Sequence, residues 1–214
     1  MSKPLPHDRL IADLSRNLKP VRRVRPTRLV LLWLVVVALF ADFFAIRADL
    51  HVMMAHLMLQ PYMWLAAISS ALTALLAVIA AFMTGMPGRS PRWALLPLPA
   101  LAWWIFEGAM GFAHIWRLPA FQDASMLGAE YSFGFILLVS LPLSALLALL
   151  LRRTYPLRPT LTATLAGLAA AAAAATLLNF FHAYDGSLAD LVAHAGSVVI
   201  VIAGNRLCAR WLIR

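Results

Sequence analysis

The sequence predicts an all-α polytopic membrane protein with six transmembrane helices, and three observations support this fold class. The 214-residue chain is 63% hydrophobic and only 13% charged, whereas a soluble domain is about half apolar and about a quarter charged. Apolar runs of about eighteen residues or more recur along the chain. Its basic residues gather in alternate gaps between these runs. The shortage of charge excludes an ordinary soluble enzyme and a disordered chain.

The chain divides into a basic N-terminal head over residues 1–28 and a membrane domain over residues 29–214. The head is too long and too charged for the start of a signal peptide, so we expect the first apolar segment to be an uncleaved span. Each segment can cross about 30 Å of hydrocarbon as a helix. The six expected spans are residues 29–46, 61–83, 93–113, 131–151, 160–181 and 190–207.

Proline, glycine and alanine residues predict breaks, a kink and a packed helix face within the membrane domain. Glycine and proline mark the breaks after the second and fourth spans, in residues 85–91 and 155–159. Pro97 and Pro99 predict a kink near the start of the third span. The alanine run over residues 169–175 predicts a tightly packed face on the fifth span.

The basic residues predict the orientation of the bundle. Sixteen of the eighteen lie in the head, in the second and fourth gaps and at the C-terminus, which leaves only Arg47 and Arg117 on the other side. Because short cytoplasmic segments are enriched in Lys and Arg, both termini are expected inside the cell. This topology fits a multi-pass membrane protein, with the lipid bilayer as its surroundings.

The head contains one helical pattern. Leu10, Ile11, Leu14 and Leu18 recur on one stripe of a helix that follows Pro6 and ends before Pro20. So short a helix needs something to pack against. Two interpretations stay open: the stripe lies on the inner leaflet with its arginines on anionic headgroups, or it enters a groove on a cytosolic partner.

Residues 10–26, LIADLSRNLKPVRRVRP, resemble the opening of the NrsF family of bacterial anti-sigma factors. The later chain is also similar to this family. Its matching features are Arg158-Pro159, the Ala-rich fifth span with Gly167, then His182, Asp185, Ser187 and His194, and finally Arg206, Arg210 and Trp211.

The resemblance implies a membrane-held negative regulator, not an enzyme, that binds an ECF-type sigma factor through its head. It would keep the sigma factor from RNA polymerase until an envelope, metal or redox stress signal arrives, and it would not touch nucleic acid itself. The residues that the resemblance assigns to sigma-factor binding are Leu10, Ile11, Asp13, Leu14, Leu18, Pro20, Val21, Arg22 and Arg23.

Residues expected near the outer face could sense a metal or a change of pH, although no resident cofactor is expected. Several family members carry cysteines in these regions, whereas the single cysteine here is Cys208. Imidazole and carboxylate groups suit transition metals, but the spacing of these residues does not place them on one helix face. The candidate ligands are Asp49, His51, His56, His114 and His182.

Asp42, Glu107 and His194 are ionisable residues that fall within the expected spans. Ionisable groups in hydrocarbon are candidates for function, and the two carboxylates leave open a small six-span transporter or ion-coupled protein. A structural role, hydrogen-bonded to a neighbouring helix, is the simpler interpretation. His194 is the one plausible intramembrane haem ligand, and such a site needs facing histidines.

Overall fold

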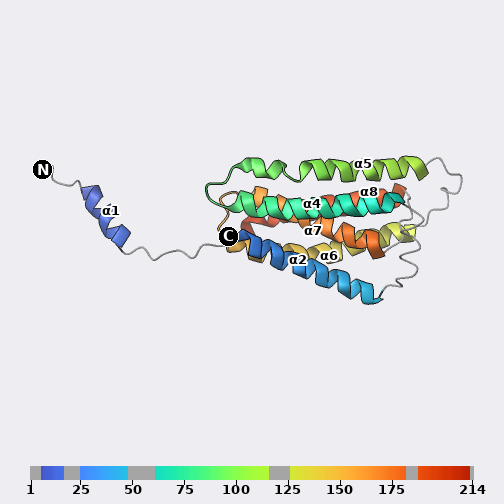
Figure 1. The fold of residues 1–214 in the computed structure, drawn as a ribbon, viewed down its shortest axis with the longest axis horizontal. Coiled ribbons are helices and arrows are strands. Elements are labelled where there is room, and N and C mark those ends of the chain that lie inside the picture. Colours follow the sequence, from blue (N-terminus) through green and yellow to red (C-terminus); the bar gives the residue numbers. More distant parts are fainter. Residues whose placement is uncertain (1–5, 17–24, 48–60, 116–125, 182–187, 213–214) are drawn as a thin grey trace.

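The computed structural model describes residues 6–16, 25–47, 61–115, 126–181 and 188–212, and all of the regular structure in this part of the chain is helical (Figure 1). One helix belongs to the head, and the others form an up-and-down bundle. The elements are α1 (Pro6–Arg16), α2 (Pro26–Arg47), α4 (Pro61–Gly85), the 3-10 helix η1 (Pro91–Leu95), α5 (Leu98–Ile115), α6 (Met126–Arg152), α7 (Pro159–Phe181) and α8 (Leu188–Leu212).

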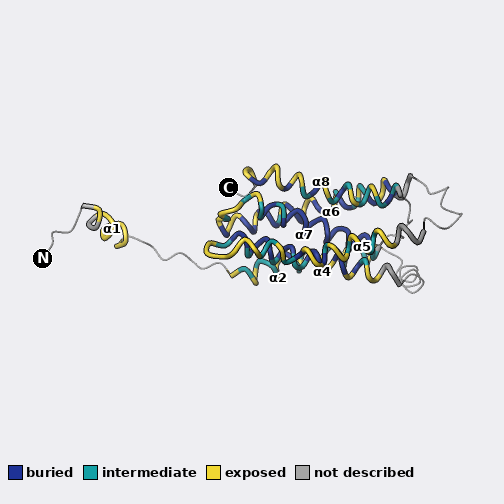
Figure 2. Tube along the Cα trace, turned by 90° about the horizontal axis from the view of Figure 1, so that it is seen from above, coloured by how far each residue is buried: buried dark blue, intermediate teal, exposed yellow. Residues whose placement is uncertain are grey.

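Six of these segments are long and apolar enough to cross a membrane, which confirms the predicted spans. Large apolar side chains are exposed on the bundle, such as Leu31 and Leu39 on α2 and Leu138 and Leu141 on α6. Figure 2 shows exposed residues along the outer helices. A soluble protein rarely exposes so continuous an apolar surface. In a bilayer, these side chains face lipid tails that are as apolar as they are.

The third span differs from its prediction. We expected one kinked helix over residues 93–113, but the chain forms η1 first and starts α5 at Leu98. Ser90 caps η1 by accepting a hydrogen bond from the Arg92 amide at 3.3 Å. Proline lacks an amide proton, so Pro97 and Pro99 fit the start of a helix, where amides have no intrahelical partner. The prolines therefore set the beginning of α5.

Helix α7 is the centre of the bundle and packs against α4, α6 and α8. Every residue of its alanine run, 169–175, is buried, and Figure 2 shows the helix enclosed by its neighbours. Between helices in a membrane there is little hydrophobic driving force, so association depends on close van der Waals packing. Alanine allows this close approach, as the sequence predicted.

The tightest crossing joins α7 to α8 at Gly167. A Cβ atom placed there would lie 3.0 Å from Ile202 Cα and 3.0 Å from Asn205 Cβ. Nearby, Asn205 Nδ2 donates a hydrogen bond to Ser144 Oγ on α6 at 3.0 Å. Three helices are thus joined by one close crossing and one buried polar contact.

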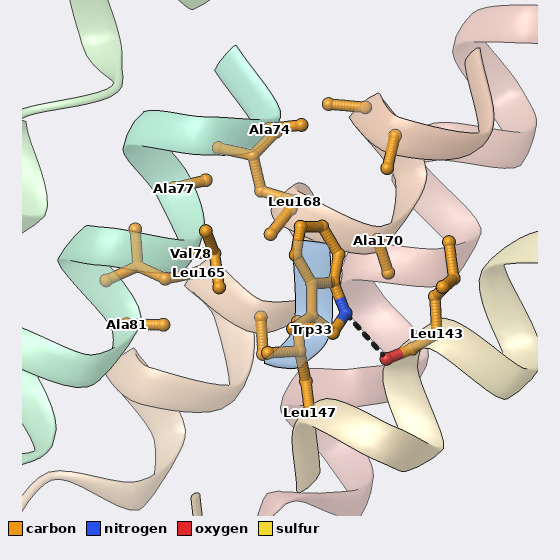
Figure 3. Close-up of a cluster of buried hydrophobic side chains, with 14 of the residues drawn as sticks. Trp33, Ala74, Ala77, Val78, Ala81, Leu143, Leu147, Leu165, Leu168 and Ala170 are labelled. Carbon is orange, nitrogen blue, oxygen red and sulfur yellow. Dashed lines mark hydrogen bonds between the residues drawn. The ribbon is translucent and has the colours of Figure 1, made fainter. Parts of the chain in front are cut away.

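Helix α2 lies at the edge of the bundle, and Trp33 is the one residue on it that is buried. Figure 3 shows its indole ring among Val78 of α4, Leu147 of α6 and Leu168 of α7. The Trp33 Nε1–H group donates a hydrogen bond to the carbonyl oxygen of Leu143 at 3.3 Å. Trp33 therefore anchors α2, the helix that follows the head, to the rest of the bundle.

Candidate functional site

The first candidate site is the exposed apolar face of α1. Proline at the first position suits a helix start, and Arg16 in the last turn suits the helix dipole. Leu10, Ile11 and Leu14 are 58%, 64% and 63% exposed. They lie within about 100° of each other around the helix axis. Three large apolar side chains on one face of a short helix form a surface suited to a partner groove or a lipid surface.

The rest of the predicted head site is only partly described. Asp13 is exposed and lies beside the apolar face, which the spacing of α1 predicts. Leu18, Pro20, Val21, Arg22 and Arg23 lie outside the described residues. Their roles remain predictions, as does the division of the chain after residue 28.

The second candidate site is the end of the bundle from which the head extends. The start of α2, the α4–η1 and α6–α7 connections and the end of α8 all lie at this end (Figure 1). Among the described residues, nine arginines occur there, and all nine are exposed. They are Arg25, Arg28, Arg89, Arg92, Arg152, Arg153, Arg158, Arg206 and Arg210. We call this set the arginine face.

The carboxylates of the bundle lie away from the arginine face. Asp42 is near the far end of α2, Glu130 is just after the first turn of α6, and Asp190 is in the first turn of α8. Glu107 is in the half of α5 farther from the arginine face. The described bundle is therefore positive at the end next to the head and has its negative side chains toward the other end.

Comparison of the sequence with known protein families identifies the family to which this head and bundle belong. The chain matches the family NrsF, described as "Negative regulator of sigma F", over residues 14–214. The chain belongs to the NrsF family. No curated protein and no solved structure matches it significantly.

NrsF membership confirms the resemblance and makes a sigma factor the class of partner. The match begins at Leu14, so it covers Leu14 and Leu18 and the segment after α1, whereas Leu10, Ile11 and Asp13 precede it. The placement of these three residues in the head site rests on the exposure of their side chains and on their helical spacing.

The intramembrane residues of this NrsF protein do not form one site. Glu107 is partly buried and accepts a hydrogen bond from Trp103 Nε1 of its own helix at 2.9 Å. Asp42 is exposed on α2, which packs on α4, α6 and α7, whereas α5 packs mainly on α4. Nothing in the described residues brings these two carboxylates together into one site across the bundle.

His194 is enclosed near the far end of α8. Its ring meets that of Trp104 edge to face, with 5.9 Å between the ring centroids. Its Nε2 atom is buried and has no hydrogen-bond partner among the described residues. An aromatic ring faces this histidine, so the contact gives no support to a haem site between paired histidines.

The predicted metal ligands fall almost entirely outside the described residues. Asp49, His51, His56 and His182 are in undescribed segments, and His114 is in the last turn of α5. Within the described ranges, no group of three or more His, Cys, Asp or Glu residues could hold a metal ion. The metal site therefore remains a prediction.

Two structural contacts were not anticipated from the sequence. Trp103 and Glu107 are four residues apart, a spacing that places two side chains together on a helix, so this pair could have been found. Trp33 carries no such signal. A tryptophan in the early part of a span suggests an interfacial aromatic, and only the packing of α4, α6 and α7 around it shows that it is buried.

Proposed function

We propose that this protein is a membrane-held anti-sigma factor of a bacterial inner membrane. Its head faces the cytosol, binds an ECF-type sigma factor and keeps it from RNA polymerase. An envelope stress, such as a metal or redox signal, releases the sigma factor. The protein acts by binding and has no catalytic role. The observation that carries this proposal is the exposed apolar face of α1 in a member of a family of sigma-factor regulators.

The structure favours binding through α1 over transport through the bundle. The apolar side chains of α1 are exposed and available to a groove. The centre of the bundle is instead filled by the buried alanines of α7 and the apolar side chains around them. The distribution of arginines supports a cytosolic position for the arginine face and hence for the head.

A charge placed on the apolar face of α1 tests the proposal. Leu14→Arg puts a charged group where a hydrophobic contact is expected, and loss of such an anchor costs about 2 kcal/mol or more, roughly thirtyfold in affinity. Ala12→Arg is the matched control because it adds the same group about 160° away around the helix. The full-length protein, purified from its native membranes, should recover a sigma factor identified by mass spectrometry.

The two variants separate the competing interpretations of α1. We expect Leu14→Arg to lose the sigma factor and to raise transcription of its target genes, while Ala12→Arg retains both binding and repression. Recovery of no sigma factor by the wild-type protein, or equal recovery by the two variants, would contradict the proposal. The second result would assign the apolar face to the lipid surface.

A further inference from the structure

The arginine face raises a question that the head alone does not answer. Its nine arginines are all exposed, and no Asp or Glu of the described bundle lies at this end. The positive-inside rule explains why basic residues are on this side. It does not require that the whole end of the bundle lack a carboxylate, because acidic residues have little effect on topology.

The segments that carry these arginines meet at one end of the bundle. A Cβ atom on Gly85, at the end of α4, would lie 3.4 Å from Thr154 Oγ1 and 3.5 Å from Pro156 Cβ, so the α4–η1 and α6–α7 connections are adjacent. Arg152 Nη2 donates a hydrogen bond to the carbonyl oxygen of Trp211 at 2.9 Å, which joins the ends of α6 and α8. All of these segments meet at one end in Figure 1.

Part of this face lies over the centre of the bundle. Arg158 directly precedes α7, the helix that α4, α6 and α8 enclose. Anionic lipid headgroups surround a bundle at its rim. An exposed arginine at the start of the enclosed helix is therefore better placed to meet a protein that covers the end of the bundle.

The segment between α1 and α2 is short enough to keep a partner that α1 binds close to the arginine face. Nine residues separate Arg16, the end of α1, from Pro26, the start of α2. Fully extended, a chain of this length spans at most about 35 Å. A 100-residue domain has a radius of gyration of about 13 Å, so its diameter is of the same order as this reach. A protein held by α1 therefore stays within contact distance of the arginine face, at a millimolar effective concentration.

We propose that the arginine face is a second contact surface for the protein that α1 holds, and that it fits an acidic surface of that partner. This inference rests on the proposed function, because it takes the partner to be the sigma factor. Opposite charges at this distance favour the docked state and speed association, whereas a basic surface would be repelled. The head then supplies the apolar anchor, and the bundle selects among sigma factors by charge.

The experiment removes charge from the connections and keeps the head intact. The variant carries Arg89→Gln, Arg92→Gln, Arg153→Gln and Arg158→Gln in the full-length protein. A second variant carries Arg89→Lys, Arg92→Lys, Arg153→Lys and Arg158→Lys. Arg47→Gln is the control for loss of one charge at the opposite end. Each protein is placed in nanodiscs of neutral phosphatidylcholine, and its affinity is measured for the sigma factor recovered with the wild-type protein. Thermal unfolding checks that the variants are folded.

We expect the glutamine variant to bind about tenfold more weakly at about 0.05 M salt, as four surface ion pairs of ordinary strength predict. The difference should shrink to less than about twofold at about 0.5 M salt, where charges are screened within a few ångströms. The lysine variant and Arg47→Gln should bind as the wild type does. Association should slow more than dissociation quickens.

Each other outcome refutes a defined statement. Equal affinity of the wild type and the glutamine variant at low salt, with Leu14→Arg still abolishing binding, overturns this inference alone and leaves the arginines to lipid or topology. Recovery of no sigma factor by the wild-type protein overturns the proposed function, and this inference with it. Weakening by Arg47→Gln equal to that of the glutamine variant would show a non-specific effect of net charge and would also overturn the inference.

Discussion

Trp33 is the one buried side chain of α2, and Trp33→Ala measures how much it contributes to holding α2 on the bundle. Trp33 is fully buried, whereas the other side chains of α2 are exposed or only partly buried. An aromatic side chain buries 150–250 Å², so at about 20 cal/mol per Å² of cavity surface its removal costs about 3–5 kcal/mol. Lipid is as apolar as the bundle interior, which removes most of the transfer contribution and favours the lower value, about 3 kcal/mol.

The indole N–H adds a smaller contribution. Its hydrogen bond to the Leu143 carbonyl oxygen is 3.3 Å long. Buried hydrogen bonds between membrane helices average about 0.6 kcal/mol. Trp33→Phe removes this bond and part of the ring but keeps most of the packing, so we expect a loss of about 1–2 kcal/mol.

The free energy of unfolding is measured on the purified protein in mixed micelles with an increasing fraction of sodium dodecyl sulfate. Leu39→Ala is the matched control, because Leu39 is a large apolar residue on the lipid-facing side of the same helix. We expect Trp33→Ala to unfold at a clearly lower detergent fraction, Trp33→Phe at an intermediate one and Leu39→Ala near the wild type. A shift for Trp33→Ala no larger than that for Leu39→Ala would refute this account of how α2 is held.

Two further predictions concern the interior of the bundle and use the same unfolding measurement. Gly167→Ala should destabilise by about 1–3 kcal/mol, because its methyl group would overlap Ile202 and Asn205, whereas Gly134→Ala should cost nothing, since nothing lies within 4 Å of its Cβ position. Equal effects would contradict the close crossing of α7 and α8. Ser144→Ala should cost about 0.6–1.7 kcal/mol by removing the acceptor of the Asn205 side chain, and an unchanged unfolding midpoint would show that this contact is not stabilising.

Much of the architecture could be predicted because the responsible interactions are local. Six apolar runs predicted six spans, since a backbone in hydrocarbon must satisfy its own hydrogen bonds as a helix. The helical spacing of Leu10, Ile11 and Leu14, which is also a local property, predicted the amphipathic helix of the head. The third span was predicted less well, because whether Pro97 and Pro99 kink a helix or begin one depends on the residues before them.

The candidate site could be predicted only in part. The apolar face of α1 and the excess of arginine on one side are visible in the sequence, and the motif after α1 indicated the family. The residues proposed to bind metal could not be evaluated from spacing, because their proximity depends on how separate spans pack. For Asp42 and Glu107, the packing shows two separated carboxylates, where the sequence left open a shared pathway.

The sequence by itself determined that this is a six-span membrane protein with a basic, amphipathic head, because hydropathy, charge and helical period act within single segments. The tertiary structure decided which helix is central, where α2 is anchored and that the arginines of four separate segments form one face. These properties depend on which side chains from distant segments come within a few ångströms of each other. The apolar spans of this chain are too alike in composition for the sequence to specify which of them pack against each other.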